Sequence, residues 1–364
     1  MSNPTQVEEE KFDFARHEES AISEYLKVLS FYENVASVNS RIVEEAIKRR
    51  EIQVHSVQGR AKDPESFGRK AIKPSENDPN QPKYIQPLRE ITDLSAIRII
   101  TFFPRTIDQI DSMLREEFEL IERSDKSEYL LEDGKFGYQS IHYLVKLNKT
   151  RATLSEYERF TDAITEVQVR TILQHAWAEI EHDIQYKSST TIPVDIRRRF
   201  MALAGLLEIA DREFQTIQDD DQALRVKDQA LVQAGVLVDV EITPSALKTY
   251  LDKQLGSDAR ISDFSYDWTA RLLKKLGFNN FQQVDDCIRP YDHNATSRLL
   301  AGNIQGQLTR FEYMLVAGMG TNYIDRHHYN KQEWHKDYIN RLLIKLEKKG
   351  LKTGTFDPLE KANY

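Results

Sequence analysis

The chain has 364 residues, of which 30 % are charged and 40 % hydrophobic, and its formal net charge is -8. This length allows two domains that each bury a core of their own. The acidic balance argues against a general nucleic-acid coat, because wholesale phosphate binding requires a basic surface, but it leaves room for a local basic groove.

The number of cysteines and the first ten residues indicate the cellular compartment of the protein. The single cysteine, Cys287, has no second cysteine for an internal disulfide or a thiolate metal site. Residues 1–10 carry neither a basic start nor an apolar run, so no signal peptide is expected. No stretch approaches the roughly 20 apolar residues of a membrane span. These features predict a soluble, cytoplasmic protein without a membrane partner.

The first ninety residues combine a helical pattern with polar segments. Residues 1–10 are expected to form a flexible tail, and apolar residues at helical spacing predict one or two helices over 12–51. A basic stretch follows over 48–73. Residues 74–87 contain four prolines among polar residues and predict an exposed loop, which its position between two motifs suggests is a flap on the substrate side.

Strand patterns dominate the next hundred residues. The sequence predicts strands over 96–103, 138–147 and 165–171, a helix over 107–118, and a helix that continues from the last strand. In the second strand apolar residues alternate with His142, Leu144 and Lys146, so the two sets face opposite sides. Strands mixed with helices of this length imply an α/β or α+β layer fold.

The C-terminal part has helical patterns. One long helix is expected over 194–222, Thr243-Pro244 is typical of a helix start, and a helix over 268–276 should end at Gly277. We therefore expect one domain over 11–235, with helical flanks, and a mainly helical second domain over 236–364.

A basic set follows the first helical segment. Arg60, Lys62, Ser66 and Lys70 place three cations and a hydroxyl within about three helical turns, and Pro64 suits a helix start. Such a set would grip the polyphosphate of a nucleotide. The alternative is a solvated basic helix.

Two acidic residues, Asp93 and Glu166, stand at the edges of predicted strands. Carboxylates on neighbouring strands can share one Mg²⁺, and phosphoryl transfer needs little beyond a metal, cations and an aligned nucleophile. Glu166 is also placed to take a proton from an attacking hydroxyl. The alternative is that Arg98 and Arg170 pair with these carboxylates in ordinary salt bridges.

Two further sets have an open interpretation. Tyr138, after Gly137, is either an exposed ring that stacks on a base or a core aromatic. The helical spacing of His175, Glu179 and His182 resembles a metal set, but metal binding is disfavoured because these residues match no known type of metal site.

Four motifs, in this order, resemble the RelA/SpoT-type alarmone synthetase domain. They are Arg60-x-Lys62…Ser66…Lys70, Asp93-Leu-x-Ala-x-Arg98, Gly137-Tyr-Gln-Ser-Ile-His142 and Glu166-Val-Gln-Val-Arg170-Thr. The helix from Ile172 to His182, followed by Tyr186-Lys187, extends the similarity. Together they cover about residues 40–190, and the order of four motifs is far more specific than any one of them.

The resemblance implies a nucleotidyltransferase-like mixed sheet flanked by helices. It also implies Mg²⁺-dependent transfer of pyrophosphate from ATP to the 3′-hydroxyl of GDP or GTP, with release of AMP. Asp93 corresponds to a metal ligand, and Glu166 to the second acid and catalytic base. The remaining matches are, for ATP and phosphate, Arg60, Lys62, Ser66, Lys70 and Arg98, and, for the acceptor nucleotide, Lys135, Tyr138, Gln139, His142, Gln168 and Arg170, with Tyr138 stacking on guanine.

The chain departs from the family pattern in the acceptor loop. The family usually carries a lysine four positions before the stacking tyrosine, where this chain has Gly134, and Lys135 lies one position later. This leaves the choice of acceptor open. Hydrolase activity is not expected, since about 50 residues precede the basic motif and His182-Asp183 has no second histidine set upstream.

Three functions remain in contention. The first is the synthetase. The second is a toxin that pyrophosphorylates the 3′ end of tRNA, held at Arg60 and 197–199, with 236–364 as fused neutraliser or sensor. The third is an inactive nucleotide-binding regulator, which the presence of both Asp93 and Glu166 disfavours. A homo-oligomer and a protein effector of the C-terminal domain are possible partners. An aromatic cluster in this domain would contact such an effector, cover the active site, or form an ordinary aromatic core with surface histidines, and the last interpretation is favoured. The cluster consists of Tyr323, His327, His328, Tyr329, Trp334 and His335.

Overall fold

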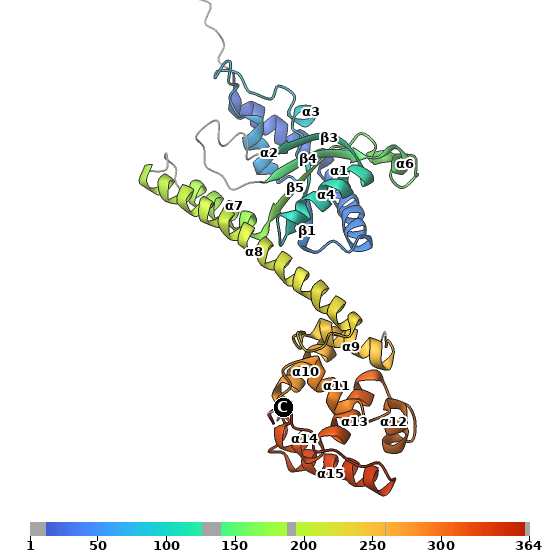
Figure 1. Ribbon diagram of the computed structural model, residues 1–364. Coiled ribbons are helices and arrows are strands. Elements are labelled where there is room, and N and C mark those ends of the chain that lie inside the picture. The colour runs from blue at the N-terminus through green and yellow to red at the C-terminus, as the bar shows by residue number, and fades with distance from the viewer. Residues whose placement is uncertain (1–11, 126–139, 188–193, 259, 361–364) are drawn as a thin grey trace, which may run out of the picture. The chain divides into compact units, whose positions relative to one another are not determined.

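The computed structural model describes residues 12–125, 140–187, 194–258 and 260–360 (Figure 1). The chain divides into two compact units, Met1–Ile217 and Gln218–Tyr364. The border between them crosses a long helix, α8 (Val194–Ala234), whose last residue adjoins the border predicted at 235. No helix in the described ranges is long and apolar enough to cross a membrane. The predicted tail, residues 1–10, lies outside the described residues.

The first unit is built around one mixed sheet. Its elements before α8 are α1 (Phe14–Arg49), β1 (Val54–Ala61), α2 (Pro64–Ala71), α3 (Pro87–Glu90), β2 (Ser95–Thr101), α4 (Arg105–Glu117), β3 (Phe118–Asp125), β4 (Ile141–Leu147), α6 (Lys149–Ala152), a 3₁₀ turn (Glu158–Phe160), β5 (Thr165–Thr171) and α7 (Ile172–Lys187). The strand order is β1-β2-β5-β4-β3. The central pair, β2 and β5, is parallel, and the other neighbours are antiparallel.

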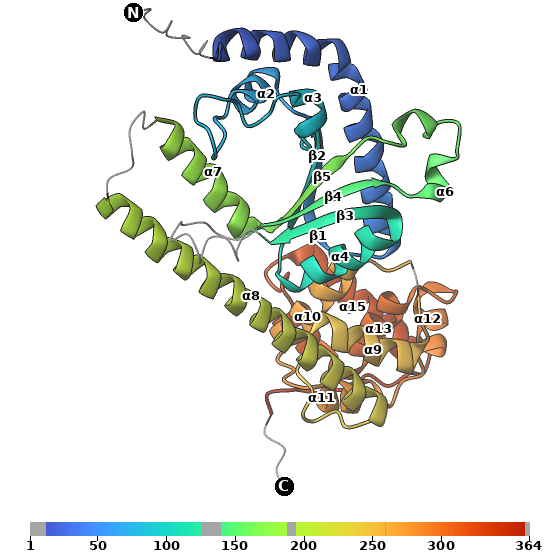
Figure 2. The same cartoon turned by 90° about the horizontal axis from the view of Figure 1, so that it is seen from above.

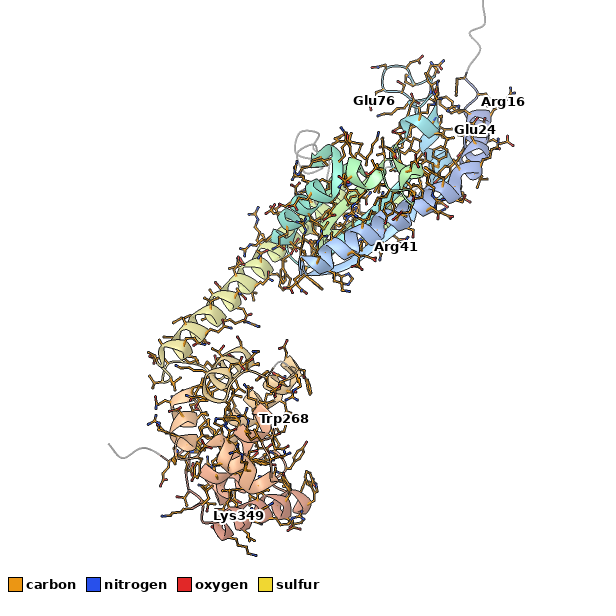
Figure 3. The ribbon with its side chains drawn as sticks, turned by 90° about the vertical axis from the view of Figure 1, so that its right-hand side faces the viewer. Arg16, Glu24, Arg41, Glu76, Trp268 and Lys349 are labelled. Atoms are coloured by element: carbon orange, nitrogen blue, oxygen red, sulfur yellow. The ribbon has the colours of Figure 1, made fainter. Side chains whose placement is uncertain are left out.

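Helices α1 and α4 cover one face of this sheet (Figure 2). Apolar residues on β2, β4 and β5 point into that core, where Ile97, Tyr143 and Val167 are fully buried. Gly59 on β1 faces α1 so closely that a Cβ would overlap the Ser40 side chain and lie 2.9 Å from the Ala36 carbonyl oxygen. The other face of α1 is exposed, as Arg16, Glu24 and Arg41 show in Figure 3. The chemistry-bearing residues therefore belong to the opposite face of the sheet.

The structure confirms the layer fold and most predicted elements of this unit. The strand over 165–171 is confirmed residue for residue, and the alternation around His142 agrees with the burial along β4. The predicted helix over 107–118 begins at Arg105, and the segment over 12–51 forms one helix. Residues 74–87 form no helix or strand before α3 begins, and only an isolated bridge pairs Pro74 with Pro82.

Two edge strands were not predicted, and one placement was wrong. β1 and β3 are edge strands with many exposed polar side chains, so neither shows the apolar run of a central strand. The expectation that residues 60–70 share about three helical turns is wrong for Arg60, because α2 begins only at Pro64. Arg60 instead lies on β1, whereas Ser66 and Lys70 do share α2, which Asp63 caps by accepting from the Ser66 N–H at 2.9 Å.

Helix α8 is longer than the sequence predicted. It continues from Gln222 to Ala234, because this segment contains no helix breaker before Gly235, whose φ of +81° ends the helix. In both views α7 lies alongside the first part of α8 (Figures 1 and 2), and the rings of Trp177 and Phe200 meet there at 5.1 Å.

The second unit is helical, as predicted. After the end of α8 it contains α9 (Pro244–Leu255), α10 (Asp263–Leu276), α11 (Phe281–Ile288), α12 (His293–Ala301), α13 (Gln307–Met319), α14 (Thr321–Arg326) and α15 (Glu333–Lys348). Thr243 caps α9 by accepting from the Ala246 N–H at 3.2 Å, and Gly277 ends α10 in the left-handed region at φ +104°. Both predicted helix boundaries are thus confirmed. The regulatory role expected for this unit stays a prediction.

The aromatic cluster of this unit is partly core and partly surface. Tyr323, His327 and His335 are buried, and the two imidazole rings stack with their centroids 4.0 Å apart. Tyr329 and Trp334 are exposed. Burial, aided by the neighbouring histidines, lowers the pKa of His327 to about 4. A proton on His327 is therefore disfavoured in the folded unit.

Acid is expected to destabilise the second unit through His327. The folded-state pKa of His327 is below the ordinary value of 6.5. Its contribution to the free energy of unfolding is therefore fully present above pH 6.5 and is lost as pH falls toward 4. Protonation of His327 in the unfolded state should lower the free energy of unfolding by about 2 kcal/mol at pH 5. Urea unfolding of the wild type and of His327→Gln at pH 7 and pH 5 measures it. The wild type should lose more stability than the variant; equal losses would contradict the assignment.

Candidate active site

The open face of the sheet carries two rows of polar side chains, set by the strand register. One row runs across four strands through directly paired residues: Gln58, Arg98, Gln168 and His142. The next row contains Arg60, Ala96 and Glu166. Since paired residues project to the same side, both rows lie opposite the α1 and α4 core. The expectation that Asp93 and Glu166 stand at neighbouring strands is confirmed, because Asp93 lies two residues before β2 and Glu166 lies on β5, which pairs with β2.

Ala96 leaves an open hollow between two charged residues. It stands between Arg60 and Glu166 in its row and has only a methyl group. The hollow is lined by residues from β1, α2, the segment before β2, and β5, namely Arg60, Lys62, Asp63, Ser66, Asp93, Ala96, Glu166 and Gln168. A second hollow, beside Arg98 and Gln58, shares Arg60, Ala96 and Gln168 with the first. The two hollows adjoin on the sheet face, and we call them together the groove.

Asp93 is held between two lysines. Lys62 Nζ lies 2.7 Å from Oδ2, and Lys70 Nζ lies 3.0 Å from Oδ1. Burial alone would raise the pKa of Asp93, but the two ammonium groups outweigh it and hold the pKa below its ordinary value. The carboxylate is thus ionised at neutral pH, and it fixes two cations at the edge of the hollow.

Glu166 is held by a different set of partners. His142 Nδ1 lies 2.8 Å from its Oε1, and Gln168 Nε2 donates to its Oε2 at 2.9 Å. The hydroxyl of Ser140 lies 2.8 Å from the other ring nitrogen of His142. Burial alone would raise the pKa of Glu166, but the contacts with His142 and Gln168 hold it below its ordinary value. Glu166 is therefore an oriented, ionised carboxylate.

The two arginines do not pair with Asp93 or Glu166, so the salt-bridge alternative is wrong. Arg98 pairs with Glu179 of α7 at 3.1 Å, and the buried Arg170 donates to Gln168 Oε1 at 3.0 Å. Burial and the charge of Arg98 lower the pKa of Arg170. Both arginines therefore lie at the α7 end of the groove. Neither forms a salt bridge with Asp93 or Glu166.

Some residues that the sequence singles out are not described by the structure. Lys135, Tyr138 and Gln139 lie outside the described residues, as does the side chain of His182. His175 Nδ1 lies 3.6 Å from Glu179, and within the described ranges no three histidine, cysteine or acidic side chains form a metal cluster.

Comparison with known proteins finds a similarity over the part of the chain that carries this groove. Residues 59–191 match the family model described as "Region found in RelA / SpoT proteins". We call residues 59–191 the RelA/SpoT-type region after this match. The match begins on β1, ends just after α7, and contains every residue that lines the groove except Gln58.

Individual relatives are similar over the same part of the chain. GTP pyrophosphokinase YjbM of Bacillus subtilis (strain 168) is 30 % identical over 141 residues, 37 % of this chain and 63 % of that protein. GTP pyrophosphokinase YwaC of the same organism is 25 % identical over 132 residues, 36 % of this chain and 59 % of that protein. The chain thus spans about 60 % of the length of these relatives.

Solved structures are similar at lower identity. The crystal structure of small alarmone synthetase 1 from Bacillus subtilis has 22 % sequence identity and a TM-score of 0.45, and the match covers 55 % of this chain and 98 % of that chain. Another crystal structure of the same protein, bound to its product pppGpp, gives 23 % identity and a TM-score of 0.43, covering 54 % of this chain and 97 % of that chain.

Several residues of the candidate site escaped the sequence interpretation. Asp63 lines the hollow and caps α2, which the sequence Asp63-Pro64 signals as a helix start. Ala96 and Gln58 carry no chemical signal of their own and are recognised only from the strand register. Ser140 lay within a motif, but its contact with His142 required the geometry of β4.

Proposed function

We propose that the RelA/SpoT-type region transfers pyrophosphate from ATP to the 3′-hydroxyl of a guanosine nucleotide. The observation that carries this proposal is the convergence of Arg60, Lys62 and two ionised carboxylates on one hollow, with Lys70 at its edge. Phosphoryl-type transfer relies on positioning and charge stabilisation, and this hollow supplies both. The names of the curated relatives support the same reaction.

The donor side is the end of the hollow at β1 and α2. Arg60 and the lysines held by Asp93 present positive charge to the triphosphate of ATP, and Ser66 adds a hydroxyl on α2. Because Lys62 and Lys70 are already oriented by Asp93, little side-chain entropy remains to be lost when phosphate oxygens arrive. This arrangement favours a polyphosphate over a single phosphate group.

The acceptor side is the end at β4 and β5, where Glu166 faces the hollow. The acceptor's 3′-hydroxyl transfers its proton to Glu166 as its oxygen bonds to the β-phosphorus of ATP. The bond between that phosphorus and the oxygen bridging to the α-phosphate breaks, and AMP leaves with this oxygen. His142 and Gln168 hold Glu166 in place for the transfer.

Asp93 and Glu166 fit a magnesium ion. Mg²⁺ is usually held by one or two carboxylates together with substrate phosphates, and both carboxylates line the hollow. Asp93 Oδ1 is buried and Lys70 Nζ lies 3.0 Å from it, so a second lone pair of this oxygen remains for a cation. When bound, Mg²⁺ would neutralise charge on the transferred group.

An acceptor panel tests the proposed function. The full chain is incubated with Mg²⁺ and γ-labelled ATP, and GDP, GTP and bulk tRNA are offered separately. Label on a guanosine nucleotide, with AMP released, is the expected result. Label on tRNA alone would make the protein a tRNA-modifying toxin, and transfer to no acceptor would leave a nucleotide-binding regulator; either result would overturn the proposal.

Filling the hollow should block the reaction without harming the fold. Ala96→Leu extends a side chain into the space between Arg60 and Glu166, outside the apolar core. We expect kcat/KM to fall at least about tenfold, because a misplacement of 1 Å can cost about 100-fold. Ala223→Leu, at an exposed position on α8, is the matched control. If Ala96→Leu kept the wild-type kcat/KM, this hollow would not be the site of the reaction.

A further inference from the structure

A pocket of the second unit lies between α10 and α13. Its volume is about 300 Å³, and one face of each helix contributes side chains to it. Six of the side chains that line it are apolar or aromatic: Phe264, Trp268, Leu272, Leu308, Phe311 and Leu315. We call this space the α10–α13 pocket. A concave, mostly apolar space of this volume is typical of small-molecule sites.

The packing of the two helices sets the shape of the α10–α13 pocket. The Tyr266 hydroxyl of α10 donates to Gln307 Oε1 of α13 at 2.8 Å, and both side chains are buried. Phe311 and Leu315 are buried as well, whereas Phe264 is 76 % exposed. The pocket therefore has a floor that belongs to the hydrophobic core and an aromatic rim that faces solvent.

The acidic side chain that lines the α10–α13 pocket is Glu312 of α13. Its Oε1 accepts from the Tyr323 hydroxyl at 2.8 Å, and Tyr323 on α14 is fully buried, so the carboxyl group has a fixed position. In the described parts of the chain no group donates to Oε2, and this oxygen is not sealed from solvent. Oε2 can therefore accept a hydrogen bond from a bound molecule.

The surroundings of Glu312 favour a positively charged ligand. Within the described ranges no lysine, arginine or histidine forms a salt bridge with Glu312, and burial raises its pKa although Tyr323 donates to it. A carboxylate withdrawn from water without a cation is costly, so a cation in the pocket would stabilise it. Trp268, labelled in Figure 3, lines the same pocket, and the face of an indole ring attracts cations.

We propose that the α10–α13 pocket binds a small organic cation, a molecule with an apolar body and a protonated amine. The apolar walls cover the body, and the amine donates to Oε2 of Glu312. A nucleotide or another anion suits the pocket less well, because its charge would lie beside that of Glu312. This inference concerns the second unit alone and does not depend on the proposed function.

Two probes of similar shape test the role of charge. The full chain is titrated with 4-phenylbutylamine and with 4-phenylbutanol at neutral pH, where only the amine is charged, and ligand-observed NMR gives each dissociation constant. The amine should bind at least about tenfold more tightly, because a hydrogen bond to a charged group is stronger than one between neutral groups. Binding of neither probe, or equal affinity for both, would overturn the proposal.

Glu312→Gln tests whether this preference comes from the pocket. The amide oxygen still accepts from Tyr323, but the negative charge is gone. The variant should lose the preference for the amine and keep the affinity for the alcohol within about threefold. Glu347→Gln, at an exposed position on α15, is the matched control and should keep the preference. If the preference survived in Glu312→Gln, the amine would bind elsewhere on the acidic chain and the proposal would be wrong.

A filling substitution tests the location independently of charge. Thr309 lines the pocket, and Thr309→Phe would occupy the space of the ligand's apolar body. It should weaken the binding of the amine and of the alcohol at least about tenfold. Asn340→Phe adds the same ring at an exposed position on α15 and should leave both affinities within about twofold. Unchanged affinities in Thr309→Phe, or equal losses in both variants, would contradict binding in this pocket.

Discussion

Glu166→Gln is expected to lower kcat for pyrophosphate transfer by about 100- to 10,000-fold, the usual contribution of a general base. The amide has the same shape and can still contact His142 and Gln168, but it cannot accept the proton of the 3′-hydroxyl. Initial rates at saturating ATP and acceptor measure kcat directly. Because the substitution is isosteric, the thermal unfolding midpoint should change little.

Glu119→Gln is the control for this variant. Glu119 lies exposed on the edge strand β3 and lines neither hollow of the groove. It should keep kcat within about twofold of the wild type, as surface substitutions away from a site usually do. If Glu166→Gln also kept kcat within about threefold, Glu166 would not be the base, and the acceptor side of the account would be wrong.

Asp93→Asn is expected to reduce kcat/KM for ATP by at least about 100-fold, through two losses. The amide removes the negative charge that holds Lys62 and Lys70 at the edge of the hollow, and it weakens the proposed magnesium site. Removing one such electrostatic group costs about 3 to 4 kcal/mol in comparable sites. Rates measured over a Mg²⁺ titration should show a higher requirement for the ion.

The matched control is Asp162→Asn, at an exposed position just before β5. It should leave both kcat/KM and the Mg²⁺ dependence unchanged. If Asp93→Asn lost activity but kept the wild-type Mg²⁺ dependence, Asp93 would act only by orienting the lysines. If Asp93→Asn kept full activity, Asp93 would take no part in the reaction.

The central strands could be predicted because their sequences are apolar and alternating. The bounds of β5 were predicted correctly. The position of Asp93 and Glu166 at the edges of two such strands led to the correct expectation that they are neighbours. β1 and β3 were missed because edge strands expose polar side chains and carry no apolar run. This error displaced Arg60, since a strand places it beside Ala96 whereas a helix would not.

Pairings between distant residues could not be derived from local sequence. Asp93 lies 31 residues from Lys62, and Glu166 lies 24 residues from His142, so only the strand register brings them together. The nearer arginines, Arg98 and Arg170, were plausible partners by sequence but point along the groove to other groups.

The most direct test of the proposed reaction is the chemical identity of its products. After incubation with ATP, Mg²⁺ and the preferred guanosine acceptor, ³¹P NMR and chromatography determine which group moved and where it is attached. We predict equimolar AMP and a guanosine nucleotide with pyrophosphate on its 3′-oxygen. ADP together with a singly phosphorylated acceptor, or ATP hydrolysis with an unchanged acceptor, would contradict the account.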